Sequence, residues 1–358
     1  MANTILDNIE EIKKLDVQNM LGSLQLLSQQ VEQIWAQAKK LKIPFSYGKA
    51  KNIIVLGMGG STLGAHVFKT LFKNKLTVPV EILNDYDLPA FVGRDSLVIA
   101  SSYSGGTEEP LNAVKQARQK GAKIVGICAG GKLADWCLAN HYPVLIFDTD
   151  NNPSQQPRMG LGYSIVGQLL LLNQVGILKI SAKNIKEIIK YLSFYDQQFG
   201  VSNQGIDNLA KQLARQIESR CVWYVASEHL TGNAHVGANQ LNENAKRFAG
   251  YFVLPELNHH LLEGMQNPQS NAQNLLFVLF ESKFYHSRNQ KRYQITKQVL
   301  DKNGIQHFDY VGAGKNRLAQ VCEILVFTSY VSFYTAILEG IDPSPIPFVN
   351  YFKEQMKT

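Results

Sequence analysis

Two segments of this sequence share one organisation, and together they restrict the possible fold more than any other feature of the chain. Residues 53–64 read IIVLGMGGSTLG, and residues 97–109 read LVIASSYSGGTEE. Each is an apolar run of strand type that leads into a loop of small residues and then into helix-like sequence. The pattern is typical of buried strands in an α/β protein, with loops that can hold a phosphate group at the start of a helix.

Apolar strand-like runs alternate with helix-like stretches along most of the chain, and this alternation predicts parallel sheets flanked by helices. Strands are expected at 53–57, 80–83, 97–101, 123–127 and 144–148, and again at 221–227, 251–257, 275–280 and 307–312. Helices are expected at 62–73, 110–120, 232–249, 287–304 and 316–338. The expected fold class is therefore α/β, built from two units that show no visible sequence similarity to each other.

The length of 358 residues corresponds to about two domains. We expect two helices within residues 4–40 and helical sequence from Gly162 to Phe199 that bridges the two domains. The prolines of segment 342–356 predict an extended tail that ends in a short helix. The expected divisions are N-terminal helices over 1–46, a first α/β domain over 47–200, a second over 201–341 and a C-terminal tail over 342–358.

The charge and composition of the chain indicate which class of molecule it can bind. The chain is 45% hydrophobic and 18% charged, which is an ordinary globular composition. Its formal net charge is +7, but the basic residues are scattered, and the densest cluster is Lys39, Lys40 and Lys42. The sequence therefore does not favour nucleic-acid binding, whereas a modest positive potential suits an anionic substrate.

Cysteine usage and hydropathy indicate a cytoplasmic protein without a membrane partner. None of the cysteines belongs to a CxxC pair, so free thiols are expected rather than a zinc or redox motif. No run reaches about 18 uninterrupted apolar residues, and the charged N-terminus does not look like a signal peptide. The four cysteines are Cys128, Cys137, Cys221 and Cys322.

The second glycine-rich loop carries three hydroxyl groups. Ser102, Ser104 and Thr107 can each donate to a phosphate oxygen, and the helix that follows adds partial positive charge at its start. The alternative is that these residues only cap the helix, which explains Thr107 well but not the two serines upstream. We expect a phosphate cradle, and because the loops contain no lysine, they favour a sugar phosphate over a nucleotide.

A dinucleotide remains a minority alternative. GMGGSTLG is similar to a dinucleotide-binding turn, and Asp85 or Asp87 could supply the acidic residue that such a site needs near the end of the next strand. No GxxxxGK[ST] motif is present, which excludes a P-loop nucleotide-binding protein.

Together the two loops resemble the sugar isomerase (SIS) domain. QPRMGLGY (156–163), QLNENAKR (240–247), PELNHH (255–260) and the end IDPSP…YFKEQM extend the resemblance over about residues 50–356, to the bifunctional phosphoglucose/phosphomannose isomerases. The resemblance implies two doubly wound SIS domains and interconversion of glucose 6-phosphate and fructose 6-phosphate, with mannose 6-phosphate as a second substrate. It implies no cofactor or metal, and a homodimer with a shared active site.

An aldose–ketose isomerase needs a ring-opening group, a base that moves a proton between C1 and C2, and a positive charge beside the enediolate. The resemblance assigns Glu243 as the base, Arg158 as the cation, and His259, from the neighbouring subunit, with Lys353 as the ring-opening groups. Gly60, Ser61, Ser102, Ser104 and Thr107 are implied as the phosphate-binding residues.

Three positions depart from the family pattern. His260 stands where asparagine is common, SGGT replaces SGNT in the cradle, and Ser344 lies in the segment where a threonine is linked to accepting mannose 6-phosphate.

Simpler interpretations exist for each candidate residue. By helical spacing, Glu243 shares a face with Val236, Asn239 and Arg247, so it could be an exposed carboxylate paired with Arg247. We favour a catalytic role, because a segment with three asparagines and few apolar anchors suits the lining of a polar cleft. Arg158 and Lys353 could be ordinary surface charges, and the His259–His260 pair could be a surface feature.

A rival hypothesis from another class is a non-catalytic sugar-phosphate sensor built on the same domains. Such regulators usually carry a DNA-binding helix-turn-helix. Residues 1–46 look helical but contain no evident basic recognition helix, so the isomerase is favoured over the sensor.

Overall fold

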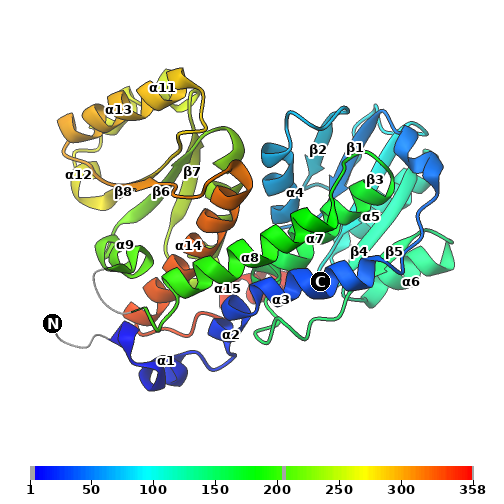
Figure 1. Cartoon of the computed structure of the whole chain (residues 1–358), viewed down its shortest axis with the longest axis horizontal. Helices are drawn as coiled ribbons and strands as arrows, with labels where there is room; N and C mark the ends of the chain where they lie inside the picture. The colour runs from blue at the N-terminus through cyan, green and yellow to red at the C-terminus, as the bar shows by residue number, and fades with distance from the viewer. Residues whose placement is uncertain (1–4, 204–206, 357–358) are drawn as a thin grey trace.

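The computed structural model describes residues 5–203 and 207–356 and contains two open, entirely parallel sheets, each flanked by helices (Figure 1). The first sheet has strand order β2-β1-β3-β4-β5 and the second has order β7-β6-β8-β9. Every strand pair in the described chain is parallel. The α/β fold expected from the sequence is confirmed.

The first sheet follows the apolar runs of the sequence, because strands buried on both faces read as continuous hydrophobic segments. Its strands are β1 (Asn52–Leu56), β2 (Val80–Leu83), β3 (Ser96–Ser101), β4 (Lys123–Cys128) and β5 (Val144–Ile146). The helices between them are α4 (Gly60–Leu71), α5 (Glu108–Gln119) and α6 (Gly131–Ala139).

The second sheet repeats this arrangement with one strand fewer among the described residues. Its strands are β6 (Cys221–Ala226), β7 (Ala249–Val253), β8 (Leu275–Glu281) and β9 (Gln306–Val311). Its helices are α9 (Leu209–Ile217), α10 (Thr231–Asn244), α11 (Leu257–His260), α12 (Asn271–Asn274), α13 (Ser287–Lys302) and α14 (Arg317–Leu338), with short 3-10 turns η5 (Glu228–Leu230) and η6 (Glu263–Gln266).

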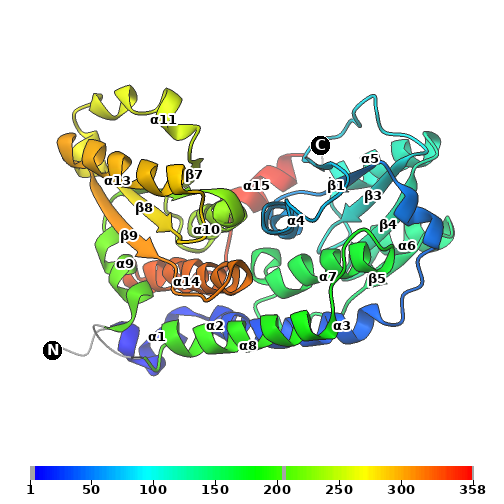
Figure 2. The same cartoon turned by 45° about the horizontal axis from the view of Figure 1, so that its top comes forward.

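The remaining elements precede, connect and follow the two sheets. They are η1 (Ile5–Asp7), α1 (Ile9–Leu15), α2 (Met20–Gln25), α3 (Leu27–Ala38), η2 (Phe45–Lys49), η3 (Pro157–Met159), α7 (Leu161–Gln174), α8 (Ala182–Phe199) and α15 (Pro347–Gln355). Both views show α3 and α8 side by side beneath the two sheets, which ties the halves together (Figures 1 and 2). The expected extended tail with a short final helix is confirmed.

Several boundaries expected from the sequence are wrong. The N-terminal region forms three α-helices rather than two, because the Asp16 carboxylate accepts from the N–H groups of Met20 and Leu21 and starts a new helix. The connection between the halves is two helices, α7 and α8, separated at the turn that contains Gly176, whose φ is +77°.

Two further corrections concern the second half. Strand β7 ends at Val253, ahead of Pro255, which has no N–H to contribute to a sheet. Helix α10 ends at Asn244 rather than at residue 249, because Lys246 adopts a left-handed φ of +53°.

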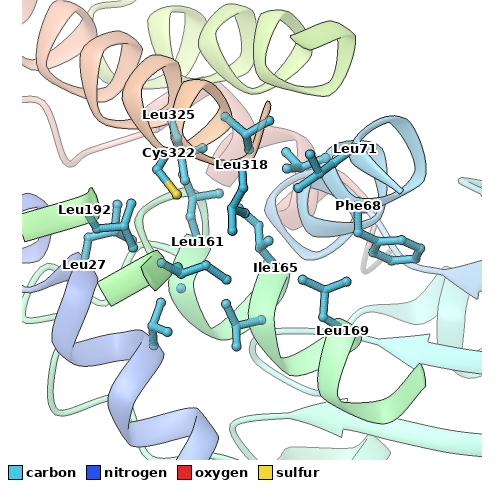
Figure 3. A pocket seen from close by; sticks show the side chains of 16 residues that line it. Leu27, Phe68, Leu71, Leu161, Ile165, Leu169, Leu192, Leu318, Cys322 and Leu325 are labelled. Atoms are coloured by element: carbon cyan, nitrogen blue, oxygen red, sulfur yellow. The ribbon is translucent and has the colours of Figure 1, made fainter. Parts of the chain in front are cut away.

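The core where the halves meet is apolar. Helix α14 is long and apolar enough to cross a membrane, but 94% of its apolar window is buried inside the protein, so it serves as a core helix. A cavity of about 30 Å³ lies between helices α3, α4, α7, α8 and α14 (Figure 3). Only apolar groups face this cavity, including Phe68, Leu169 and the Cys322 side chain, so it offers a water molecule no hydrogen-bond partner.

Candidate active site

The two glycine-rich loops meet at the reversal point of the first sheet. Strand β1 is hydrogen-bonded to β2 on one side and to β3 on the other, so the chain order reverses between β1 and β3. The loops that follow β1 and β3 therefore leave the same edge of the sheet side by side. A crevice at this point is the usual ligand position in open parallel sheets.

The hydroxyl groups of these loops are linked to one another. Ser61 Oγ accepts from the N–H of Tyr103 at 2.9 Å, which joins the first loop to the second. Ser102 Oγ and Thr107 Oγ1 lie 3.0 Å apart, and Ser104 Oγ accepts from the N–H of Gly106. The Ser61 and Ser104 hydroxyls thus act as acceptors here, which leaves their protons available to an anion.

The capping interpretation of Thr107 is wrong. Thr107 occupies the N-cap position of α5, but its side chain makes no capping hydrogen bond and pairs with Ser102 instead. The cap residue of α4, Gly59, has no side chain to offer. The start of each helix therefore lacks a side-chain cap, which suits an anion held there by backbone N–H groups.

Gly60 brings the cradle into contact with Arg158. A Cβ atom at Gly60 would lie 2.8 Å from the carbonyl carbon of Pro157 and 2.9 Å from the nitrogen of Arg158. Only glycine permits this approach between the start of α4 and η3. The first loop is thus packed directly against the backbone that carries the arginine.

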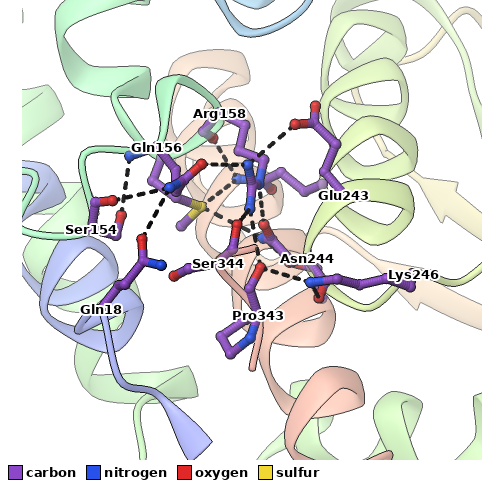
Figure 4. Close-up of polar contacts among 12 residues, drawn as sticks. Gln18, Ser154, Gln156, Arg158, Glu243, Asn244, Lys246, Pro343 and Ser344 are labelled. Carbon is purple, nitrogen blue, oxygen red and sulfur yellow. Dashed lines mark hydrogen bonds and ion pairs between the residues drawn. The ribbon is translucent and has the colours of Figure 1, made fainter. Parts of the chain in front are cut away.

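Arg158 is not the surface residue of the simpler interpretation. Its side chain is 1% exposed, and each of its five N–H groups has an acceptor (Figure 4). One acceptor is the neighbouring Gln156 and the other four come from two distant segments, so the guanidinium joins η3 to α10 and to the tail. They are Asn244 Oδ1 at 2.5 Å, Gln156 Oε1 at 2.8 Å, Glu243 Oε2 at 3.2 Å, and the carbonyl oxygens of Pro343 at 3.0 Å and Ser344 at 2.9 Å.

Glu243 pairs with Arg158 rather than with Arg247, which makes an ion pair with Glu339. The expected face shared with Arg247 does not exist, because α10 ends before that residue. Burial raises the pKa of the Glu243 carboxyl, and the positive charges of Arg158, Lys353 and Lys246 only partly offset this effect. The side chain keeps 31% of its surface exposed, so a substrate can reach it.

The polar residues of α10 meet the expectation of a cleft lining only in part, because Asn242 is exposed whereas other amides of the helix are not. Asn233, Gln240 and Asn244 are fully buried between neighbouring helices and are hydrogen-bonded. Gln240 donates to the carbonyl oxygen of Arg158 and accepts from the Ser329 hydroxyl. These amides fix the position of the arginine and of the helix that carries Glu243.

Lys246 belongs to the same cluster, although it was not among the candidate residues expected from the motif QLNENAKR. Its ammonium donates to the carbonyl oxygens of Asn244, Asp342 and Pro343 at 3.0, 2.9 and 3.1 Å. The pKa of Lys246 is lowered to about 8, mainly by burial and also by the charge of Arg158, while the charges of Asp342 and Glu243 oppose the change.

The remaining two candidates lie on exposed elements. Lys353 is on α15, close enough for its charge to lower the pKa of Glu243, so the structure brings Arg158, Glu243 and Lys353 together. His259 is exposed on α11 and makes no side-chain hydrogen bond with the described part of its own chain, and both views place α11 away from α15 (Figures 1 and 2). His260 contacts the ring of Phe252. The structure of one chain thus does not bring His259 to Glu243.

Comparison with known proteins accounts for both halves of the chain. Residues 46–175 match the SIS domain, and residues 206–356 match the bacterial phospho-glucose isomerase C-terminal SIS domain. The chain is 31% identical to the bifunctional phosphoglucose/phosphomannose isomerase of Caldicellulosiruptor bescii over 340 residues, which cover 94% of this chain and 98% of that protein.

The chain belongs to the bifunctional phosphoglucose/phosphomannose isomerase family. The family member from Aquifex aeolicus is also 31% identical, over 86% of this chain and 91% of its own length. Among solved structures, the C-terminal domain of glucosamine-fructose-6-phosphate aminotransferase from Francisella tularensis has the same fold, with a TM-score of 0.66 at 14% identity, covering 91% of this chain and 96% of that one. Membership of this isomerase family identifies the protein as a sugar-phosphate isomerase and does not favour the sensor hypothesis.

Proposed function

We propose that this protein interconverts glucose 6-phosphate and fructose 6-phosphate, and accepts mannose 6-phosphate as a second substrate. The observation that carries the proposal is the ion pair between the buried Arg158 and the partly exposed Glu243, held beside the glycine-rich cradle through Gly60. The phosphate group would be bound by Gly60, Ser61, Ser102, Ser104 and Thr107. The first domain, 47–200, would thus bind phosphate, and the second domain, 201–341, would supply the catalytic Glu243 and His259.

Glu243 would act as the base. Its carboxylate removes the proton from the carbon beside the carbonyl, and the electron pair moves to the carbonyl oxygen to give an enediolate. Return of the proton to the neighbouring carbon, together with transfer of the hydroxyl proton from one of the two oxygens to the other, completes the isomerisation. Because burial raises the pKa of Glu243, the carboxylate is a stronger base than an exposed one and is better matched to a neutral medium.

Arg158 would stabilise the enediolate through its charge. All five of its N–H groups already have acceptors, so it is a fixed, preorganised cation and needs no rearrangement during the reaction. Lys353, on α15, would assist ring opening near the substrate hydroxyls, and this position is supported by its electrostatic effect on Glu243.

We further propose a cytoplasmic homodimer in which His259 of one chain opens the sugar ring in the site of the other. The exposed position of His259 supports the proposal, and so do the exposed aromatic side chains of α15: Phe348 is 86%, Tyr351 65% and Phe352 63% exposed. A cluster of exposed aromatics on one short helix is typical of a protein–protein contact.

Complementation tests the shared site. The variants Glu243→Gln and His259→Ala should each be inactive alone. When they are mixed under subunit exchange, half of the dimers are mixed and one of their two sites is intact, so activity should recover to about a quarter of the wild-type value. Recovery of no activity, or a monomer in sedimentation analysis, would refute the shared site.

Ser344 is the residue we propose for recognition of the C2 epimer. Its hydroxyl is fully buried and has no hydrogen-bond partner in the described part of the chain, while its carbonyl oxygen accepts from Arg158. Ser344→Ala should lower turnover of mannose 6-phosphate more than that of glucose 6-phosphate, and Ser344→Thr should preserve both. Equal losses for the two sugars would remove Ser344 from this role.

Turnover measurements separate the enzyme from the sensor. Purified protein is given fructose 6-phosphate, and the formation of glucose 6-phosphate and mannose 6-phosphate is followed by phosphorus NMR. We expect both aldoses, and their ratio gives the sugar preference. Saturable binding of fructose 6-phosphate without product would contradict the proposal and favour the sensor.

A further inference from the structure

The tail that carries Lys353 is anchored at one short segment. Pro343 and Ser344 are buried, whereas α15 contains no buried residue. Figure 2 shows α15 leading away from the end of α14 on the side of α4 and α10. Since α15 contains no buried residue and follows this buried segment directly, the way residues 342–344 are held influences the position of Lys353 relative to Glu243.

Two cations hold this segment. Arg158 Nη2 donates to the carbonyl oxygens of Pro343 and Ser344, and Lys246 Nζ donates to those of Asp342 and Pro343 (Figure 4). The Pro343 oxygen thus receives hydrogen bonds from both side chains, at 3.0 and 3.1 Å. Hydrogen bonds from charged donors are stronger than those between neutral groups.

The backbone of Lys246 is adapted to this contact. Its φ of +53° lies in the left-handed region, which is uncommon for a residue with a Cβ atom. This conformation ends α10 just after Glu243 and turns the lysine back, so that its ammonium also donates to the carbonyl oxygen of Asn244. The Lys246 ammonium therefore joins the end of the helix that carries the base to the tail.

We propose that Lys246 is a positioning residue for the isomerisation: it fixes residues 342–344 against the Arg158–Glu243 pair, and thereby sets the position of α15 and Lys353. The proposal rests on the function proposed above. The charged groups that act on the ammonium are Arg158 from η3, Glu243 from α10 and Asp342 from the tail.

Three substitutions at Lys246 separate its hydrogen bonds from its charge. Lys246→Met removes both the hydrogen bonds and the charge, Lys246→Gln keeps a neutral donor, and Lys246→Arg keeps the charge. Lys246→Gln takes the place of Lys246→Met if the methionine variant fails to fold. Lys297→Met is the matched control, because Lys297 is another lysine of the second half with a hydrogen-bonded ammonium, and it pairs with Glu281 and Asp309 away from the tail.

Hydrogen exchange of the 347–355 amides is measured by mass spectrometry. We expect exchange in α15 to become about tenfold faster or more in Lys246→Met and Lys246→Gln, and to stay at the wild-type rate in the Lys297→Met control. Unchanged exchange in both Lys246 variants would overturn the proposal. This measurement needs no turnover, so its outcome is independent of the outcome for the proposed function.

Kinetics test the positioning role. Because small displacements of catalytic groups are costly, kcat for fructose 6-phosphate should fall by about 10- to 100-fold in Lys246→Met, with KM changed by less than about threefold. The wild-type rate should also fall as pH rises through about 8, where Lys246 loses its proton, and this fall should be absent in Lys246→Arg. A wild-type kcat in Lys246→Met, or the same fall in Lys246→Arg, would overturn the proposal.

Discussion

Replacing Arg158 by lysine tests whether this side chain organises the site. The guanidinium supplies five N–H groups to five acceptors, whereas an ammonium offers three donors from a single point. At least two acceptors therefore lose their hydrogen bond while the positive charge is kept. Each unsatisfied buried polar group costs about 1–3 kcal/mol, so the free energy of unfolding should fall by about 2–6 kcal/mol.

Urea denaturation followed by circular dichroism measures this loss. The control is Arg220→Lys, because within residues 5–203 and 207–356 Arg220 donates to two acceptors, the carbonyl oxygen of Gln216 and Glu218, which an ammonium can serve. The control should lose less than about 1 kcal/mol. If Arg158→Lys lost no more than the control, the assignment of Arg158 as the shared anchor of η3, α10 and the tail would be wrong.

Four further outcomes are expected. Glu243→Gln should lower kcat by about 10³-fold or more and still bind fructose 6-phosphate, as isothermal titration would show; retained turnover would exclude it as the base. Ser104→Ala should raise KM by about tenfold with kcat nearly unchanged, because a hydrogen bond to a charged group is lost; an unchanged KM would exclude Ser104 from the cradle. The rate should fall as pH decreases through the pKa of Glu243, because the base must be ionised, and burial places this fall above the ordinary glutamate range; a fall at or below that range would contradict the burial argument. Val67→Ile, which adds one methylene at the apolar cavity, should raise the free energy of unfolding by up to about 0.8 kcal/mol in urea; a loss of 1 kcal/mol or more would show that the cavity cannot accept it.

The fold was predictable because its signals are local. Most strands of the two sheets are apolar runs bounded by loop residues, and parallel strands need no long-range pattern to be recognised. The helix boundaries were predicted wrongly at positions where a single residue determines where a helix begins or ends. The Asp16 carboxylate divides the N-terminal helices, and the left-handed Lys246 ends α10, and neither effect is visible as a periodicity.

The roles of the site residues stay predictions, and the structure adds connections that the sequence does not reveal. The loops of the expected cradle lie side by side because β1 and β3 are sheet neighbours. The five acceptors of Arg158 were not predicted, since two of them are backbone carbonyls of the distant segment Pro343–Ser344, and every residue type has a backbone carbonyl. Lys246 was missed for the same reason, because all three of its acceptors are main-chain oxygens.

Proton transfer by Glu243 is tested most directly by NMR of fructose 6-phosphate in D₂O, with wild-type protein and with Glu243→Gln. If Glu243 is the base, the wild-type protein should form the aldose, and deuterium should enter at C2 of the product during turnover. With Glu243→Gln we expect neither product nor deuterium uptake. Formation of no aldose by the wild-type protein, or equal rates for the two proteins, would contradict proton transfer by Glu243.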